Sequence, residues 1–217
     1  MPRELLRTVA WRPVRWGGSD VASLFRLDDG WEVSGVTDLE VDVTDMEPGP
    51  VMRDLSNVRI RLDYALIMNE RWQTRTARLQ LMTGTPQKRQ TCTLGVGKDG
   101  TWKHKSGNMV PELWFLQGIY HFTLDITPAL RVQQVRAMAL EVNQEQEIEA
   151  VRLNLPDFSV DPVYVLMRRT GETSYECLQT NGGMSVESQI TVDDLGLVVD
   201  QDGIWTRSVE SGPVGSV

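Results

Sequence analysis

The amino-acid sequence predicts a single all-β domain, built on a sheet that curls or closes. Two observations carry this prediction: short runs in which apolar and polar residues alternate, and glycine-containing turn signals between those runs. The length of 217 residues suits one such domain, because all-β barrels and sandwiches often reach this size. With 41% hydrophobic and 24% charged residues, the composition is that of a globular protein with a packed core.

Alternation is clearest over residues 58–66, where Val58 and every second residue after it are apolar. That period places one face of a strand in the core and the other in water. Residues 163–167 are more continuously apolar, which predicts a strand buried on both faces. Shorter alternating runs follow the first pattern at 77–81, 119–126, 150–155 and 185–192.

Turn signals separate these runs and favour tight hairpins. Asx-Gly pairs suit such turns because their central positions adopt positive φ readily. The signals are Asp28-Asp29-Gly30, Lys98-Asp99-Gly100, Asn181-Gly182-Gly183 and Asp202-Gly203. Many short strands joined in this way predict a sheet that curls or closes.

Two segments depart from the strand pattern. Residues 45–57 contain Pro48-Gly49-Pro50 and are expected to form an exposed loop. For residues 127–140 we favour a loop followed by a strand over 135–142. The alternative is a helix capped by Thr127, with one face formed by Val132, Val135, Met138 and Ala139.

No linker or repeat divides the chain, so residues 1–217 are predicted to form one domain, with a frayed tail over about 210–217. The acidic segment 141–149 is interpreted as a hairpin or a solvated edge. The N-terminus lacks the apolar core of a signal peptide, and no apolar run is long enough to span a bilayer. We therefore expect a cytoplasmic protein in which Cys92 and Cys177 are reduced and buried.

The net charge of −8 argues against nucleic acid as a partner, because such a field repels phosphate backbones. It also argues against simple electrostatic docking on an anionic membrane. The basic run Lys103-His104-Lys105 is too short to establish a local patch by itself.

Motifs for catalysis or metal binding are missing from the sequence. There is no His-Glu-x-x-His or Cys-x-x-Cys pattern, no Gly-x-Ser-x-Gly elbow and no phosphate-binding glycine loop. We expect no catalytic residues, no metal and no cofactor. A nucleophile–base pair of Cys92 or Cys177 with His121 is neither supported nor excluded by the spacing.

The aromatic residues point instead to binding, since seven tryptophans accompany only four phenylalanines. Trp72 lies in Arg71-Trp72-Gln73-Thr74-Arg75. On a strand, Trp72, Thr74 and Thr76 share one face and the two arginines share the other. Guanidinium groups near an indole suit an anionic or polyhydroxyl headgroup; the alternative is a core tryptophan beside two surface arginines.

This stretch resembles the arginine–tryptophan–x–threonine–arginine strand of the bacterial putative glycolipid-binding family. Similar segments follow in the same order, and the resemblance runs from about Trp16 to Arg207. They are residues 19–24, 30–36, 99–102, 116–118, 127–128, 192–200 and 203–207. The polar positions depart more: Ile119, His121 and Thr123 stand where the family tends to carry a cysteine and two aspartates, and only Arg136 remains of an arginine pair.

The resemblance implies an all-β fold, a spiral β-roll or partly open antiparallel barrel similar to lipoprotein carriers, with a concave site for a lipid-like ligand. We therefore expect a non-catalytic protein whose partner is an amphiphilic, glycolipid-like small molecule. Its acyl chain would lie on the apolar inner face, and the ligand-binding residues are Arg71, Trp72, Thr74, Arg75, Trp102 and Arg136. The alternatives are an interaction or scaffold domain and, third, a hydrolase of sugars or lipid esters; the oligomeric state stays open.

Overall fold

The computed structural model describes residues 3–41, 58–84, 88–105 and 111–211. In chain order their elements are β1 (Arg3–Pro13), β2 (Gly17–Leu27), β3 (Gly30–Val41), β4 (Val58–Asn69), β5 (Thr74–Thr83), β6 (Lys88–Val96), β7 (Trp102–Lys105), β8 (Glu112–Leu113), the 3-10 turn η2 (Trp114–Leu116), β9 (His121–Thr123), α1 (Arg131–Met138), β10 (Glu145–Leu153), β11 (Val160–Arg169), β12 (Ser174–Asn181), β13 (Met184–Val192), β14 (Val198–Gln201) and β15 (Trp205–Ser211).

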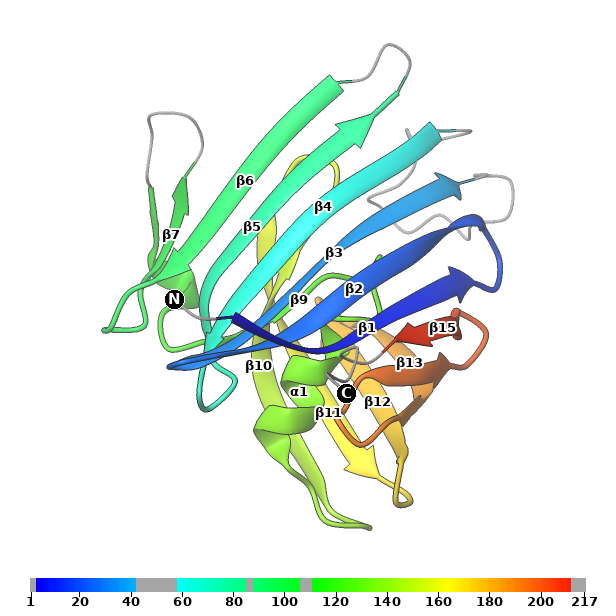
Figure 1. Ribbon diagram of the computed structural model, residues 1–217. Coiled ribbons are helices and arrows are strands. Elements are labelled where there is room, and N and C mark those ends of the chain that lie inside the picture. Colours follow the sequence, from blue (N-terminus) through cyan, green and yellow to red (C-terminus); the bar gives the residue numbers. More distant parts are fainter. Residues whose placement is uncertain (1–2, 42–57, 85–87, 106–110, 212–217) are drawn as a thin grey trace.

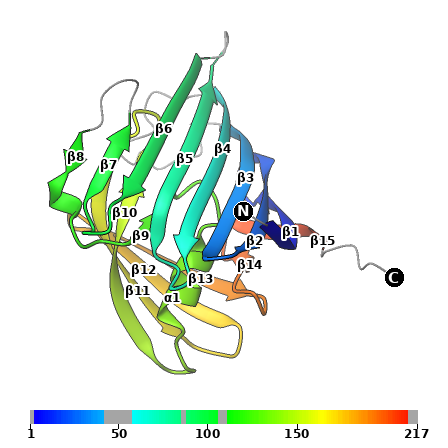
Figure 2. The ribbon, with the colours of Figure 1, turned by 60° about the vertical axis from the view of Figure 1, so that its left-hand side comes forward.

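Across these residues, fifteen strands form a single sheet in the order β8-β7-β6-β5-β4-β3-β2-β1-β15-β14-β13-β12-β11-β10-β9. All neighbours pair antiparallel except β9 and β10, which pair parallel. Strands β8 and β9 are the two edges of this sheet and are not paired with each other, so the sheet curls without closing (Figure 2). The predicted all-β, partly open roll is confirmed.

The curl places the long strands β1 to β6 on one side of the molecule and β10 to β13 on the other, with α1 beneath the first layer (Figures 1 and 2). One hydrophobic cluster joins Leu62 of β4, Val132 of α1 and Val151 of β10, all three of which are buried. The helix and the segment before it therefore form the centre of the core. Among the described residues, no helix is long and apolar enough to cross a membrane.

The prediction of a loop followed by a strand over residues 127–140 is wrong, because Arg131–Met138 form α1. The alternative helix is right in kind, but its N-cap is Leu130 rather than Thr127. Gln133 and Gln134 are fully buried in this helix. These buried polar residues interrupt the apolar periodicity from which the helix would have been recognised.

Other expectations differ in detail. Residues 163–167 lie within β11, whose outer face is open, since the side chain of Tyr164 is 48% exposed. Of residues 119–126, only His121–Thr123 form a strand. Strand β15 continues to Ser211, so part of the expected frayed tail is paired. The loop predicted at 45–57 lies outside the described residues.

Candidate functional site

Trp72 lies in the turn between β4 and β5, in the left-handed region with φ of 61°. The register shifts at this turn, so that Ile67 pairs with Thr76 and Met68 with Thr74. The resulting bulge turns Thr74 inward, where it is buried, and Thr76 toward the outer face. The expectation that Trp72, Thr74 and Thr76 share one face is therefore wrong.

The helix fixes this turn through a buried glutamine. Gln133 Nε2 donates hydrogen bonds to the carbonyl oxygen of Trp72 at 2.8 Å and to Thr74 Oγ1 at 2.9 Å. Its Oε1 accepts a hydrogen bond of 2.9 Å from the backbone N–H of Phe122. Thr74 is thus engaged in the core and ties β5 to α1.

The indole of Trp72 stacks on that of Trp31, with ring centroids 4.4 Å apart and planes 13° apart. The Arg26 guanidinium carbon lies 4.2 Å from the Trp31 ring, and that of Arg136 lies 5.8 Å from the Trp72 ring. The four side chains form a cation–aromatic stack at the β2–β3 and β4–β5 turns. The structure therefore brings Trp72 and Arg136 together, as the sequence predicts.

The other predicted site residues are dispersed. Arg75 is exposed and forms an ion pair with Asp29, and Arg71 is exposed beside Trp72. Trp102 is fully buried, and its Nε1 donates a hydrogen bond of 2.6 Å to the carbonyl oxygen of Ile119. In this conformation Trp102 anchors the core and has no exposed surface with which to flank a headgroup.

The concave face, which was expected to receive an acyl chain, is covered by the chain itself. Residues of the crossing segment pack in one cluster with the inner side chains of β1 to β6. They are Leu116, Ile119, Phe122, Leu124, Ile126, Ala129, Leu130 and Val132. A ligand on this face would have to displace that segment.

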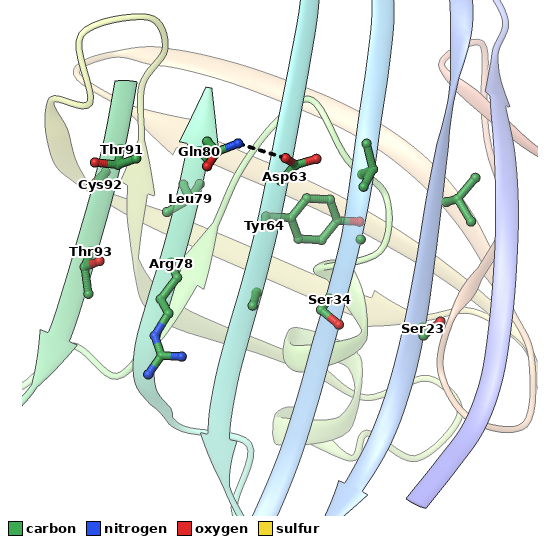
Figure 3. A pocket seen from close by; sticks show the side chains of 14 residues that line it. Ser23, Ser34, Asp63, Tyr64, Arg78, Leu79, Gln80, Thr91, Cys92 and Thr93 are labelled. Carbon is green, nitrogen blue, oxygen red and sulfur yellow. Dashed lines mark hydrogen bonds between the residues drawn. The ribbon is translucent and has the colours of Figure 1, made fainter. Parts of the chain in front are cut away.

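An open trough of about 630 Å³ lies on the opposite, outer face of β2 to β6 (Figure 3). Its floor is one row of side chains that crosses the strands from β2 to β6, in which Arg78 lies between the smaller Ala65 and Thr93. The registers place these side chains next to one another in the order Ser23, Ser34, Ala65, Arg78 and Thr93. The small residues leave the sheet surface hollow along this row.

A second row, two residues further along each strand, borders the floor. It consists of Val21, Val36, Asp63, Gln80 and Thr91 in register order. Gln80 Nε2 donates a hydrogen bond of 3.1 Å to Asp63 Oδ2, which fixes both side chains (Figure 3). This second row is therefore apolar at its β2–β3 end and polar at its β5–β6 end, whereas the floor row has the hydroxyl groups of Ser23 and Ser34 at its β2–β3 end.

Arg78 supplies a positive charge at the polar end. Its side chain is exposed, and within the described part of the chain its guanidinium has no hydrogen-bond or ion-pair partner. Lys105 of β7 continues the row beyond Thr93. The trough thus offers cationic donors next to hydroxyl groups, at residues that no pattern in the sequence singles out.

The cysteines show no sign of an activated nucleophile. The contact in the structure joins Cys92 Sγ to His104 Nε2 at 3.3 Å, whereas the pairs considered from the sequence involved His121. Burial raises the pKa of Cys92 to about 12 and lowers the pKa of His104. The thiol is therefore protonated at neutral pH, and a thiol is a poor nucleophile. In the described segments, no group of three or more His, Cys, Asp or Glu side chains is placed to hold a metal ion.

One carboxyl group is fully buried behind the trough. Asp20 of β2 is surrounded by the hydroxyl groups of Thr37, Tyr64 and Thr127. Burial raises its pKa to about 7, although the three hydrogen bonds act in the opposite direction. The Tyr64 ring reaches Asp20 by passing Gly35, since a Cβ at that glycine would lie 2.6 Å from the Tyr64 hydroxyl oxygen.

Residues 8–207 match the model of a family described as "Putative glycolipid-binding". The chain belongs to this family. A DUF1089 family protein from Pseudomonas aeruginosa has a similar crystal structure, with a TM-score of 0.69 and 20% identity over 87% of this chain and 92% of that one. A β-barrel-like DUF1849 protein from Brucella abortus has a TM-score of 0.60 and 10% identity over 97% and 99% of the two chains. No curated protein matches the chain.

Both neighbours are less than 25% identical to this chain, so the similarity concerns the fold alone. Their descriptions name no ligand. Family membership agrees with the resemblance that begins at Arg71 to Arg75.

Proposed function

We propose that this chain binds an amphiphilic, glycolipid-like molecule without transforming it, and that the outer-face trough receives the ligand. The observation that carries the proposal is the polarity gradient along the second row of the trough. Val21 and Val36 stand at its β2–β3 end, and Gln80 and Thr91 stand at its β5–β6 end, beside Arg78 and Thr93 of the floor row. A molecule with a polar head and a hydrocarbon tail has the same gradient.

The polar end suits a hydroxyl-rich or anionic head. A guanidinium group presents five N–H donors in a rigid fork, and threonine hydroxyls both donate and accept. Arg78, Thr91 and Thr93 project side by side from β5 and β6 (Figure 3). They would bind the oxygens of a sugar or of an acidic headgroup.

The apolar end suits a short length of hydrocarbon. Val21 is 42% exposed in the free protein, so covering it removes apolar surface from water. Full burial of a methylene is worth about 0.8 kcal/mol. Because the trough is open on one side, each methylene would contribute less, and we expect exchangeable rather than permanent binding.

The sequence-predicted set at the β4–β5 turn is the competing location for the headgroup. There Arg71, Arg75 and Arg136 are exposed, while Thr74 and Trp102 are buried. The arginines of this set belong to different parts of the fold, and Arg75 is already engaged in an ion pair with Asp29. The trough is therefore the better-supported location.

Titration of the delipidated protein with dodecyl maltoside below its micelle concentration tests the proposal. Chemical-shift changes in NMR spectra report where the probe binds. We expect shifts along the trough, and a dissociation constant raised about tenfold or more by Arg78→Ala or by Ala65→Gln, which fills the floor. Arg59→Ala is the matched control, since Arg59 lies on the same face and pairs with Asp38 outside the trough.

Binding that is unchanged in Arg78→Ala and Ala65→Gln would exclude the trough. Loss of binding in Arg136→Ala instead would place the headgroup beside Trp72, as expected from the sequence. Absence of any saturable binding of this and of an anionic single-chain probe, dodecyl phosphate, would contradict the proposed function itself.

A further inference from the structure

Two aromatic side chains are presented to solvent at the β8 edge of the sheet. Trp114 is 78% exposed and Phe115 is 46% exposed, and their rings form an edge-to-face pair with centroids 6.1 Å apart. Both belong to η2, which follows the edge strand β8. Exposing two large aromatic groups side by side is unfavourable in water, so the pair requires an explanation.

The turn that carries these rings is held firmly in place. The next residue, Leu116, is fully buried, and the backbone N–H of Gln117 donates to the carbonyl oxygen of Trp114 at 3.1 Å. The N–H of Ile119 donates to the carbonyl oxygen of Leu116 at 3.2 Å. The aromatic pair is thus displayed by an anchored turn.

The charge of this part of the chain is opposite to that of the rest. Residues 88–121 contain five Lys and Arg and two Asp and Glu, a net charge of +3, whereas the remaining residues contain 17 and 28, a net charge of −11. Lys103 and Lys105 are exposed on β7, and Lys103 forms an ion pair of 3.0 Å with Glu112 of β8. Lys98 is exposed in the turn between β6 and β7. The same turn contains Asp99, which with Glu112 makes up the two acidic residues of 88–121.

We propose that the β6–β8 edge docks on the surface of an anionic bilayer, with Trp114 and Phe115 inserted among the headgroups. Tryptophan favours the membrane interface, where its ring is in an apolar environment and its N–H remains near water. Lysines close to the surface add attraction to anionic lipids. Repulsion between the bilayer and the negative remainder of the chain would orient this edge toward the membrane.

A protein partner is the less favoured occupant. Exposed lysines are depleted at the centre of protein interfaces, whereas aromatic groups beside lysines are typical of membrane surfaces. Lys105 is also the cross-strand neighbour of Thr93, at the polar end of the trough. Docking at this edge would therefore bring the trough close to the lipids, although the docking proposal does not require the trough to be occupied.

Co-sedimentation with large unilamellar vesicles tests docking. Vesicles of phosphatidylcholine alone are compared with vesicles containing an equal share of phosphatidylglycerol, at low and at high salt. We expect binding to the anionic vesicles, a blue shift of tryptophan emission, and release by salt. Trp114→Ser combined with Phe115→Ser should lower the vesicle partition coefficient about tenfold or more, since two interfacial anchors are lost.

The two substitutions lie on exposed side chains, so the melting temperature is expected to stay close to that of the unchanged protein, which confirms folding. Val186→Ser is the matched control, because Val186 is 62% exposed on β13, away from this edge.

No binding of the unchanged protein to anionic vesicles at low salt would overturn the proposal, as would equal binding of the double variant. A dimer that dissociates in the double variant, without vesicle binding, would assign the edge to a second copy of the chain instead. Vesicle sedimentation and titration with monomeric probe are separate measurements, so docking and ligand binding can fail independently.

Discussion

The hydroxyl group of Thr127 lies 2.6 Å from Asp20 Oδ2, although 107 positions separate the two residues in the sequence. Asp20 belongs to β2, and Thr127 belongs to the segment that crosses the interior toward α1. Thr37 and Tyr64 bind the same carboxyl group from β3 and β4. This buried group therefore fastens the crossing segment to three adjacent strands.

Asp20 is expected to make stability depend on pH. Its pKa is raised by burial to about 7 in the folded protein, against an ordinary value of 3.8 for an exposed aspartate. Between these two values the folded state holds a proton that the unfolded state releases. The contribution of Asp20 to the free energy of unfolding is therefore full below about pH 4 and declines as the pH rises to about 7. The shift corresponds to at most about 4 kcal/mol.

Urea unfolding at about pH 5 and about pH 8 measures this effect. Asp20→Asn, which cannot ionise, should be destabilised less by the rise in pH than the unchanged protein. Asp28→Asn removes an exposed carboxylate from the β2–β3 turn and serves as the control. An equal loss of stability with pH in Asp20→Asn and in the unchanged protein would show that Asp20 is not the responsible group.

Gly35 is expected to be irreplaceable for a steric reason. A Cβ there would lie 2.5 Å from the carbonyl oxygen of Val21 and 2.6 Å from the Tyr64 hydroxyl oxygen. Gly35→Ala should lower the free energy of unfolding by about 3 kcal/mol, because the backbone must move or Tyr64 must leave Asp20. Thermal and urea unfolding measure the loss.

Gly95→Ala in β6 provides the matched comparison. At Gly95 the nearest atom to an added Cβ is 4.0 Å away. Alanine should therefore be neutral there, or stabilising by up to about 1 kcal/mol, because glycine loses more conformational entropy on folding. Equal effects at the two positions would contradict the steric explanation.

The strands were predictable because alternation follows from one-sided burial. The run from Val58 became β4, and the turns at Asp28-Asp29-Gly30 and Asn181-Gly182-Gly183 join hairpins as expected. The helix α1 was not predictable in this way, because Gln133 and Gln134 occupy core positions in it. Gln133 forms its hydrogen bonds with Trp72, Thr74 and Phe122, which are distant in sequence, and a local pattern does not contain that information.

The site was predictable only in part, for a related reason. Trp72 and Arg136 do meet, but the bulge after Trp72 changes the faces that Thr74 and Thr76 occupy. A bulge depends on the register between strands, which alternation alone does not determine. The trough was missed because its row becomes visible only when the registers of β2 to β6 place Ser23 through Thr93 in line.

Thiol reactivity separates the binding proposal from a cysteine hydrolase. Cys92 and Cys177 are both free and buried, and burial raises the pKa of Cys92 to about 12. Neither thiol should react with Ellman's reagent at neutral pH in the folded protein, and both should react after unfolding in guanidinium chloride. A folded-state thiol that reacts rapidly, with an apparent pKa close to neutrality, would favour the hydrolase instead.

The left-handed backbone of Trp72 predicts an unusual order of stabilities for two substitutions. Trp72→Ala and Trp72→Gly both remove the indole that stacks on Trp31 and lies beside Arg136. Loss of a buried tryptophan typically costs about 3–5 kcal/mol. At φ of 61°, however, alanine has a steric penalty of about 1–2 kcal/mol that glycine avoids.

Glycine also has more entropy to lose on folding, which reduces its advantage by about 0.5–1 kcal/mol. We therefore expect Trp72→Gly to be more stable than Trp72→Ala by up to about 1 kcal/mol. Trp31→Ala is the informative comparison, since it removes the same stack at a position where φ is not in the left-handed region. There Trp31→Gly should be the less stable variant. Paired urea titrations of the four proteins measure both differences, and the same order at positions 31 and 72 would show that backbone conformation does not govern the β4–β5 turn.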